Sequence, residues 1–297
     1  MTPSGQQLAL GTAQLGLDYG ITNESGRVPA AEAQAMLDAA WAGGVRMLDT
    51  APAYGSSEAG LGQAFAHRPK RAWRVITKTM PLRLPAIDSQ ALAQVDAAFQ
   101  RSLAALGAVD SLLVHHADDL LVPGGEALYG WLREQQQQGR VRRIGASIYD
   151  GPQARQLLQR YALDVVQLPA SIADQRLLAD GTVARLADAG IELHARSLYL
   201  QGLLLADPGF VAGRFPAQAA WTQRFHDECR RRALQPVQAC LSFFRGQPAL
   251  AVAVIGAASR AEIAALLAAW AAVPAGDWSG WAVDNPAFTD PRQWTNL

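Results

Sequence analysis

The sequence predicts an α/β protein that forms a single (β/α)8 barrel, the TIM-barrel architecture, over residues 1–297. Short apolar runs typical of buried parallel strands alternate with longer helical patterns along the chain, and no linker rich in proline or serine interrupts them. The runs number eight, and eight strand–helix units in 297 residues are typical of this barrel. A doubly wound open sheet uses the same units and is the alternative.

The predicted strands share a core of apolar residues flanked by polar or turn-forming ones. They cover residues 8–13, 45–49, 73–78, 109–115, 141–147, 164–168, 191–197 and 250–256. Helical segments between them end in glycine before the next strand, as helices often do. In residues 30–44, Met36, Leu37 and Ala40 share one helical face, and residues 88–107 and 180–190 repeat this arrangement.

Composition favours a small-molecule partner. Lysine plus arginine and aspartate plus glutamate number 26 each, so no net charge favours nucleic acid or an anionic membrane surface. The N-terminus lacks the basic and long apolar regions of a secretory signal, and no apolar run reaches membrane-spanning length. Cys229 and Cys240 have neither zinc-ligand spacing nor a disulfide pattern. We therefore expect a soluble cytoplasmic protein that binds neither nucleic acid nor membrane.

Polar residues gather at the C-terminal ends of the predicted strands. Asp49, Lys78, His115, Ser147 and Gln167 each lie at or near such an end. In a (β/α)8 barrel these ends carry the active site, so we expect these side chains to meet around one pocket.

Asp49, Lys78 and His115, together with the nearby Tyr54, suit the reduction of a carbonyl group. A tyrosine such as Tyr54 has an ordinary pKa near 10, so a proton-transfer role at neutral pH requires help from its surroundings. The ammonium of Lys78 would stabilise the tyrosinate, and Asp49 would hold Lys78 through a charged hydrogen bond. A histidine such as His115 could then orient the carbonyl by hydrogen bonding.

At these residues the chain resembles the aldo-keto reductase superfamily. The resemblance rests on "LDTAPAYGSSEAGLG" around Asp49 and Tyr54, "VITK" ending at Lys78, and "VDSLLVHHADD" around His115. It continues through "VVQLPASIADQR", "RSLYLQGLLL" and "AVIGAASRAEI", so it covers essentially the whole predicted barrel.

The resemblance implies a role for each residue. Tyr54 would be the general acid in carbonyl reduction, Lys78 would lower its pKa, Asp49 would pair with Lys78, and the hydride would come from a nicotinamide cofactor. Between the neighbouring His115 and His116, the family pattern selects His115 as the residue that positions the substrate oxygen. Neighbouring side chains of a strand point to opposite faces, so only one of the two enters the pocket.

The resemblance also implies cofactor contacts. Ser147 and Gln167 would bind the nicotinamide carboxamide, although Ile148 stands where relatives commonly have asparagine. The first residues of the loop after the seventh strand, Arg196 and Ser197, would also contact the cofactor, and relatives often carry an aromatic residue at Arg196. That arginine could instead reach an anionic group of the substrate.

The adenosine phosphate would lie at the start of the last predicted helix, against Gly256, Ser259 and Arg260. Arg260 favours NADP(H), since a guanidinium can bind a phosphate through two hydrogen bonds. A competing interpretation is structural, because Ser259 and Glu262 have the spacing of a capping box.

The expected activity is NADP(H)-dependent reduction of an aldehyde or ketone, with a sugar-like substrate as one option. Loops at the barrel mouth and a C-terminal tail of residues 274–297, with Trp278, Trp281 and Trp294, would choose the substrate or simply cover the barrel. One alternative is a regulatory subunit that binds cofactor with little turnover. Another is a metal-dependent hydrolase, suggested by "HHADD" at 115–119. The sequence leaves the oligomeric state open.

Overall fold

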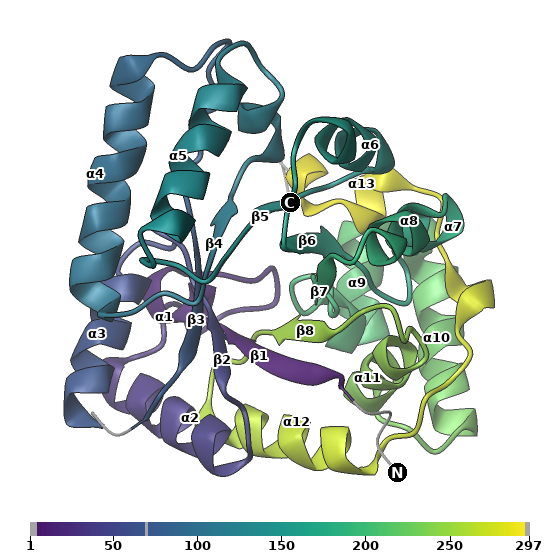
Figure 1. Cartoon of the computed structure of the whole chain (residues 1–297). Coiled ribbons are helices and arrows are strands. Elements are labelled where there is room, and N and C mark those ends of the chain that lie inside the picture. Colours follow the sequence, from purple (N-terminus) through teal and green to yellow (C-terminus); the bar gives the residue numbers. More distant parts are fainter. Residues whose placement is uncertain (1–4, 69–70, 295–297) are drawn as a thin grey trace.

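Eight parallel strands close into a barrel in which each strand pairs with its neighbour in the chain and β1 pairs with β8. This computed structural model describes residues 5–68 and 71–294, and Figure 1 shows the strands surrounded by helices. The strands found in those ranges are β1 (Gln7–Gly11), β2 (Met47–Asp49), β3 (Arg74–Lys78), β4 (Ser111–Val114), β5 (Arg143–Ser147), β6 (Val165–Pro169), β7 (Glu192–Arg196) and β8 (Val252–Ile255). The eight predicted strands and the barrel are confirmed, and the open sheet is excluded because Leu8 pairs with Ala253.

Helices follow the strands and pack outside them. The longer ones are α2 (Ala30–Ala42), α3 (Ser57–His67), α4 (Ser89–Leu106), α5 (Gly125–Gln137), α6 (Gly151–Arg160), α10 (Ala219–Arg231), α11 (Pro236–Arg245) and α12 (Arg260–Ala272). Shorter ones are α1 (Ala13–Gly16), α7 (Arg176–Ala179), α8 (Thr182–Asp188), α9 (Pro208–Arg214) and α13 (Pro286–Thr289). Short 3-10 helices occupy Ala117–Leu120, Leu203–Leu205, Pro216–Gln218, Ser279–Trp281 and Pro291–Gln293.

The predicted helix at 88–107 illustrates how sequence sets the boundaries. The carboxylate of Asp88 accepts the backbone N–H of Ala91 at the start of α4, which satisfies one of the first unpaired donors. Gly107 ends the helix at a φ of 74°, a conformation that favours glycine. Val95 and Phe99, one helical turn apart, are buried in the core.

Inside the barrel, the two-residue period of the strands stacks side chains in layers. The middle layer is an apolar cluster of Ala9, Met47, Ile76, Leu113, Val165 and Val252. Two residues farther along their strands, Met47, Ile76 and Val165 are followed by Asp49, Lys78 and Gln167, whose side chains therefore point inward at the C-terminal end. The apolar layer separates this polar end from the opposite end of the barrel.

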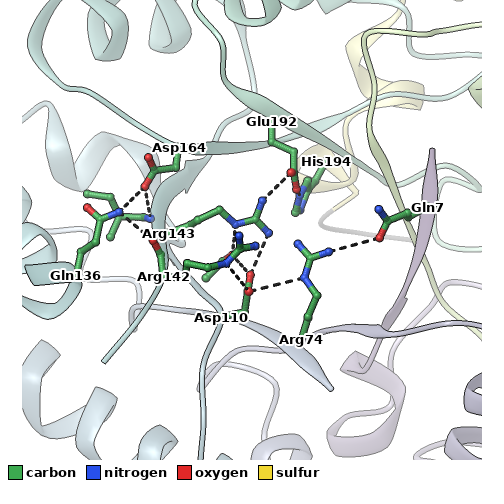
Figure 2. Close-up of polar contacts among 11 residues, drawn as sticks. Gln7, Arg74, Asp110, Gln136, Arg142, Arg143, Asp164, Glu192 and His194 are labelled. Atoms are coloured by element: carbon green, nitrogen blue, oxygen red, sulfur yellow. Dashed lines mark hydrogen bonds and ion pairs between the residues drawn. The ribbon is translucent and has the colours of Figure 1, made fainter. Parts of the chain in front are cut away.

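A network of charged residues lies at that opposite end, where β3, β5 and β7 begin, and Figure 2 shows its polar contacts. The guanidinium of Arg143 bridges Asp110, with Nη2 3.0 Å from Oδ2, and Glu192, with Nη1 2.6 Å from Oε2. The fully buried His194 lies 2.8 Å from the other oxygen of Glu192. The hydrogen bond with His194 and the charge of Arg143 outweigh burial and lower the pKa of Glu192 to about 2. Because this end of such barrels carries stability rather than chemistry, we assign the network to stability.

The C-terminal segment packs along one side of the barrel (Figure 1). Trp278 and Trp281 lie 6.1 Å from Phe225 of α10, and Trp294 lies 5.4 Å from Phe215, measured between ring centres. These tryptophans pack against other aromatic side chains and do not line the main cavity, whereas Pro291 and Arg292 of the same segment do. Within residues 5–68 and 71–294, no helix combines the length and apolar character needed to cross a membrane.

Candidate active site

The centre of the site is a buried ion pair between neighbouring strands. Lys78 Nζ, at the end of β3, lies 2.7 Å from Oδ1 of Asp49, at the end of β2. Both residues are almost fully buried, with exposed fractions of 1% and 2%. Lys78 Nζ also donates to the backbone oxygen of Thr50 at 3.0 Å and to the hydroxyl of Tyr54 at 3.3 Å. The structure thus brings Asp49, Tyr54 and Lys78 together.

Tyr54 is held by a close backbone approach between two loops. A Cβ atom added to Gly16, at the end of α1, would lie 1.8 Å from the carbonyl oxygen of Tyr54 and 2.4 Å from the amide nitrogen of Ser57. A Cβ atom added to Gly55, which has a φ of 57°, would lie 2.4 Å from the backbone oxygen of Gly16. The hydroxyl of Ser57 then donates to the backbone oxygen of Thr12 at 2.9 Å. The turn that carries the phenol is therefore fixed against the loop after β1.

A glutamine holds the second oxygen of the buried carboxylate. Gln167 Nε2, on β6, donates to Asp49 Oδ2 at 2.7 Å. Asp49 therefore has a hydrogen-bond partner for each carboxylate oxygen. The sequence singled out Gln167 for its expected cofactor contact and missed this role, because nothing in the sequence shows that residues 118 positions apart face each other across the barrel.

Beside Tyr54 stands a neutral histidine. The rings of His115 and Tyr54 meet edge to face, 5.8 Å apart at an angle of 88°. Burial, followed by the positive charges of Lys78 and Arg196, lowers the pKa of His115 to about 3. The imidazole is therefore uncharged at neutral pH and has one N–H to donate.

The neighbouring His116 turns away from the site, as strand alternation requires. Its Nδ1 lies 3.1 Å from Oδ1 of Asp119, which also accepts the backbone N–H of Arg83. Among the residues described, no group of three or more His, Cys, Asp or Glu side chains could hold a metal ion. In the "HHADD" segment, His115 thus lines the pocket, whereas His116 and Asp119 belong to a structural loop. The described residues offer no set of ligands for the metal ion of a metal-dependent hydrolase.

Burial and the charge of Lys78 shift the pKa of the Tyr54 phenol in opposite directions. Burial raises the pKa of Tyr54, the positive charge of Lys78 opposes this, and the net direction is upward. Lys78 thus acts in the expected direction, but burial outweighs it. Burial alone would lower the pKa of Lys78, yet Asp49 and Tyr54 raise it above its ordinary value, so the ammonium stays charged. At neutral pH the site holds a protonated phenol beside a charged ammonium.

These groups open into a cavity of about 720 Å³ at the C-terminal end of the barrel. Of the residues predicted from the sequence, the cavity is lined by Asp49, Tyr54, His115, Ser147, Gln167, Arg196, Ser197 and Gly256. Lys78 lies beneath Tyr54, outside the lining. The sequence missed the loop residues Tyr19, Thr22 and Gln201, which also line the cavity. They lie outside the strand ends on which the sequence argument depended.

The start of α12, where the adenosine phosphate was expected to bind, is arranged differently from that expectation. Ser259 and Arg260 do not line the cavity, and the hydroxyl of Ser259 accepts the backbone N–H of Glu262 at 3.1 Å. The carboxylate of Glu262 accepts the N–H of Ala258 at 2.8 Å, and that of Glu32, on α2, accepts the N–H of Arg260 at 2.5 Å. The backbone donors of Ala258, Arg260 and Glu262 at this helix start therefore go to the chain's own side chains, and Ser259 caps the helix as the structural interpretation implies.

Arg196 lies between the predicted cofactor contacts. Its Nη2 donates to the backbone oxygen of Ile148 at 3.0 Å, and its Nε donates to the hydroxyl of Ser147 at 3.3 Å. Ile148 replaces the asparagine common in relatives, and its side chain is fully buried. Its backbone oxygen supports the arginine instead.

Three comparisons agree with this arrangement. The model of the Aldo/keto reductase family matches residues 7–279. The NADH-specific methylglyoxal reductase of Escherichia coli (strain K12) is 28% identical over 203 residues, which are 61% of this chain and 61% of that protein. The holo form of aldo-keto reductase AKR11C1 from Bacillus halodurans shares the fold, with a TM-score of 0.72, 20% identity, and coverage of 90% of this chain and 87% of that one. Because the family model spans most of the barrel, the chain belongs to the aldo/keto reductase family.

Proposed function

We propose that this protein reduces an aldehyde or ketone to an alcohol with a reduced nicotinamide dinucleotide, and that Tyr54 is the proton donor. The observation that carries the proposal is the buried chain of contacts from Asp49 through Lys78 to the hydroxyl of Tyr54. This chain of contacts ends at a cavity large enough for a small substrate beside a nicotinamide ring.

The proposed reaction assigns one task to each side chain. A reduced nicotinamide, when bound, supplies the hydride that adds to the carbonyl carbon. Tyr54 gives its proton to the carbonyl oxygen, and the tyrosinate that forms is stabilised by the ammonium of Lys78. The neutral imidazole of His115 donates a hydrogen bond that orients the carbonyl. Gln167 and Asp49 keep the ammonium charged and in place.

The residues that line the cavity fit a nicotinamide group. Ser147 and Gln167 pair on the neighbouring strands β5 and β6, and the Oε1 atom of Gln167 can accept from a carboxamide while its Nε2 donates to Asp49. Arg196 and Ser197 border the same place, and Gly256 leads from β8 towards α12. We propose that Ser147, Gln167, Ser197 and Gly256 contact the cofactor.

For the choice of dinucleotide, the geometry favours NADH. The expectation of NADP(H) rests on Arg260, and it stays a prediction. Glu32 and Glu262 place two carboxylates where the resemblance locates the adenosine phosphate, and like charges there disfavour a 2′-phosphate. The name of the relative from Escherichia coli, an NADH-specific enzyme, is consistent with this choice.

Fluorescence titration of the purified protein with NADH and NADPH tests the choice. We expect the wild-type protein to bind NADH more tightly than NADPH. Glu32→Gln, which removes one carboxylate, should reduce the difference between the two affinities. Tighter binding of NADPH, lost in Arg260→Gln, would restore the assignment to NADP(H).

Turnover is tested by following the absorbance of the reduced cofactor with a panel of aldehydes. Loss of absorbance that Tyr54→Phe abolishes supports the reductase. Tight cofactor binding without turnover of any aldehyde would support a regulatory subunit instead.

A further inference from the structure

Arg196 is a cation in the wall of the cavity that also contains the proposed reacting residues. It ends β7, is half-buried, and lines the cavity together with Tyr54 and His115. Its charge contributes to the pKa shifts of both residues, which indicates that it lies within electrostatic reach of each.

The guanidinium is fixed in place by neutral groups. It donates to Ile148 O, Ser147 Oγ and Ser197 Oγ at 3.0, 3.3 and 3.4 Å. Its central carbon lies 4.2 Å from the ring centre of Tyr149. A guanidinium has five N–H donors, so two remain after these three bonds. Within residues 5–68 and 71–294, no acidic side chain forms an ion pair with Arg196.

Two other cations near the cavity have carboxylate partners. Lys78 pairs with Asp49, and Arg292 pairs with Asp290, with Nη2 2.6 Å from Oδ2. Arg292 also lies over the ring of Tyr149, 3.7 Å from its centre, and lines the same cavity. A half-buried guanidinium without a counter-ion can form charge-assisted hydrogen bonds with an anionic ligand in the cavity. Arg196 is thus suited to bind an anion.

From this arrangement, and resting on the proposed reductase function, we propose that the carbonyl substrate carries an oxyanion group, a carboxylate or a phosphate, that binds Arg196. Both groups present two oxygens at the spacing of the guanidinium fork. The hydride from the reduced cofactor and the proton from Tyr54 go to the carbonyl carbon and oxygen. The oxyanion itself is unchanged, and the product is a hydroxy acid or a hydroxyalkyl phosphate.

Matched pairs of substrates test this proposal. One pair is 4-carboxybenzaldehyde and its methyl ester, and the other is glyceraldehyde 3-phosphate and glyceraldehyde. We expect the charged member of at least one pair to have the higher kcat/KM, by about tenfold or more, mainly through a lower KM. The pair that shows the preference identifies the oxyanion as carboxylate or phosphate.

Substitution then assigns the preference to this side chain. Arg196→Gln should bring the charged-to-neutral ratio of kcat/KM close to one. Arg196→Lys keeps the positive charge without the guanidinium fork, so this variant should retain part of the preference for the charged substrate. Arg142→Gln, which removes a 62% exposed guanidinium at the opposite end of the barrel, should leave the ratio unchanged.

A binding measurement separates the failure of this proposal from the failure of the reductase assignment. In calorimetric titrations of the complex with oxidised cofactor, 4-(hydroxymethyl)benzoate or glycerol 3-phosphate should bind more tightly than benzyl alcohol or glycerol, even in a protein without turnover. A wild-type protein without this difference, or an Arg196→Gln variant that keeps it, overturns the role of Arg196. If Arg196→Gln weakens only the binding of the cofactor, the arginine contacts the nicotinamide and not the substrate, and the proposal is wrong.

Discussion

Gln167 and Asp49 meet across the barrel, with Nε2 of the amide 2.7 Å from Oδ2 of the carboxylate. Gln167 belongs to β6 and Asp49 to β2, and β3, β4 and β5 lie between them along one side of the closed sheet. The amide uses the oxygen that Lys78 leaves unpaired, so the buried carboxylate is fully hydrogen-bonded. This arrangement keeps the ammonium directed towards Tyr54.

Removing that amide should destabilise the protein. Gln167→Leu leaves a buried carboxylate oxygen without its donor, which costs about 1–3 kcal/mol of the free energy of unfolding. Urea unfolding measures the loss. Gln223→Leu removes an amide that donates to Asp227 on the exposed face of α10, and it should change the free energy of unfolding by less than about 0.5 kcal/mol. Equal effects from the two substitutions would contradict the role of Gln167.

Gly16 should be essential for the position of Tyr54. In Gly16→Ala, the new methyl group would overlap the backbone oxygen of Tyr54, so the turn must move. A displacement of about 1 Å at the proton donor can cost about 100-fold in rate, and we expect a loss of kcat of that order. Steady-state kinetics with an aldehyde measures it.

Gly60→Ala is the matched control. Gly60 lies inside α3, and a Cβ there meets open space. Alanine should leave kcat unchanged and stabilise the helix by about 0.5–1 kcal/mol. An active Gly16→Ala variant would show that the turn adjusts without disturbing the phenol.

The ion network at the opposite end of the barrel should support stability and not activity (Figure 2). The pKa of Glu192 is lowered from its ordinary 4.5 to about 2, so its ionised form stabilises the fold above pH 4.5. That contribution is lost as the pH falls through about 2. Glu192→Gln should therefore lower the melting temperature at pH 7, lower it progressively less towards pH 2, and leave kcat/KM unchanged.

Arg142→Gln serves as the control for this network. Its guanidinium also contacts Asp110, but it is 62% exposed, so its removal should change the melting temperature little. A large loss of activity in Glu192→Gln would mean that the two ends of the barrel are coupled through the apolar layer between them.

The pH dependence of reduction should be flat across the neutral range. His115 has a pKa of about 3 and stays neutral above it, while burial raises the pKa of Tyr54 above its ordinary 10, so the phenol keeps its proton below that value. We expect kcat/KM to show no ionisation near pH 6.5. An acidic limb near that value that disappears in His115→Asn would show that the histidine acts as a cation.

Strand-level features were predictable from the sequence because they depend on local patterns. The apolar runs and the polar residues at their ends located Asp49, Lys78 and His115. Alternation implied that only one of His115 and His116 enters the pocket, and the family pattern selected His115. Contacts between distant segments were not predictable. The bond from Gln167 to Asp49 and the approach of Gly16 to Tyr54 exist only after closure of the barrel.

Two expectations concern residues with two compatible roles. The resemblance makes Arg260 a phosphate ligand, and the structure shows that its backbone N–H goes to Glu32, a residue 228 positions away, so the role of its side chain stays a prediction. The tail tryptophans were expected either to choose the substrate or to cover the barrel, and Trp278 and Trp281 pack against Phe225 of α10. In both cases the contacting partner lies on a different helix and has no sequence signal.

The most direct test of the account is Tyr54→Phe, measured for both cofactor binding and turnover. The phenol accepts one hydrogen bond from Lys78 and leaves the lining of the cavity otherwise intact, so the variant should fold and bind the reduced cofactor with unchanged affinity. Its kcat for aldehyde reduction should fall by about 10²–10⁴-fold, the usual contribution of a general acid. A variant that binds the cofactor and still reduces aldehydes at the wild-type rate would contradict the assignment of Tyr54 as the proton donor.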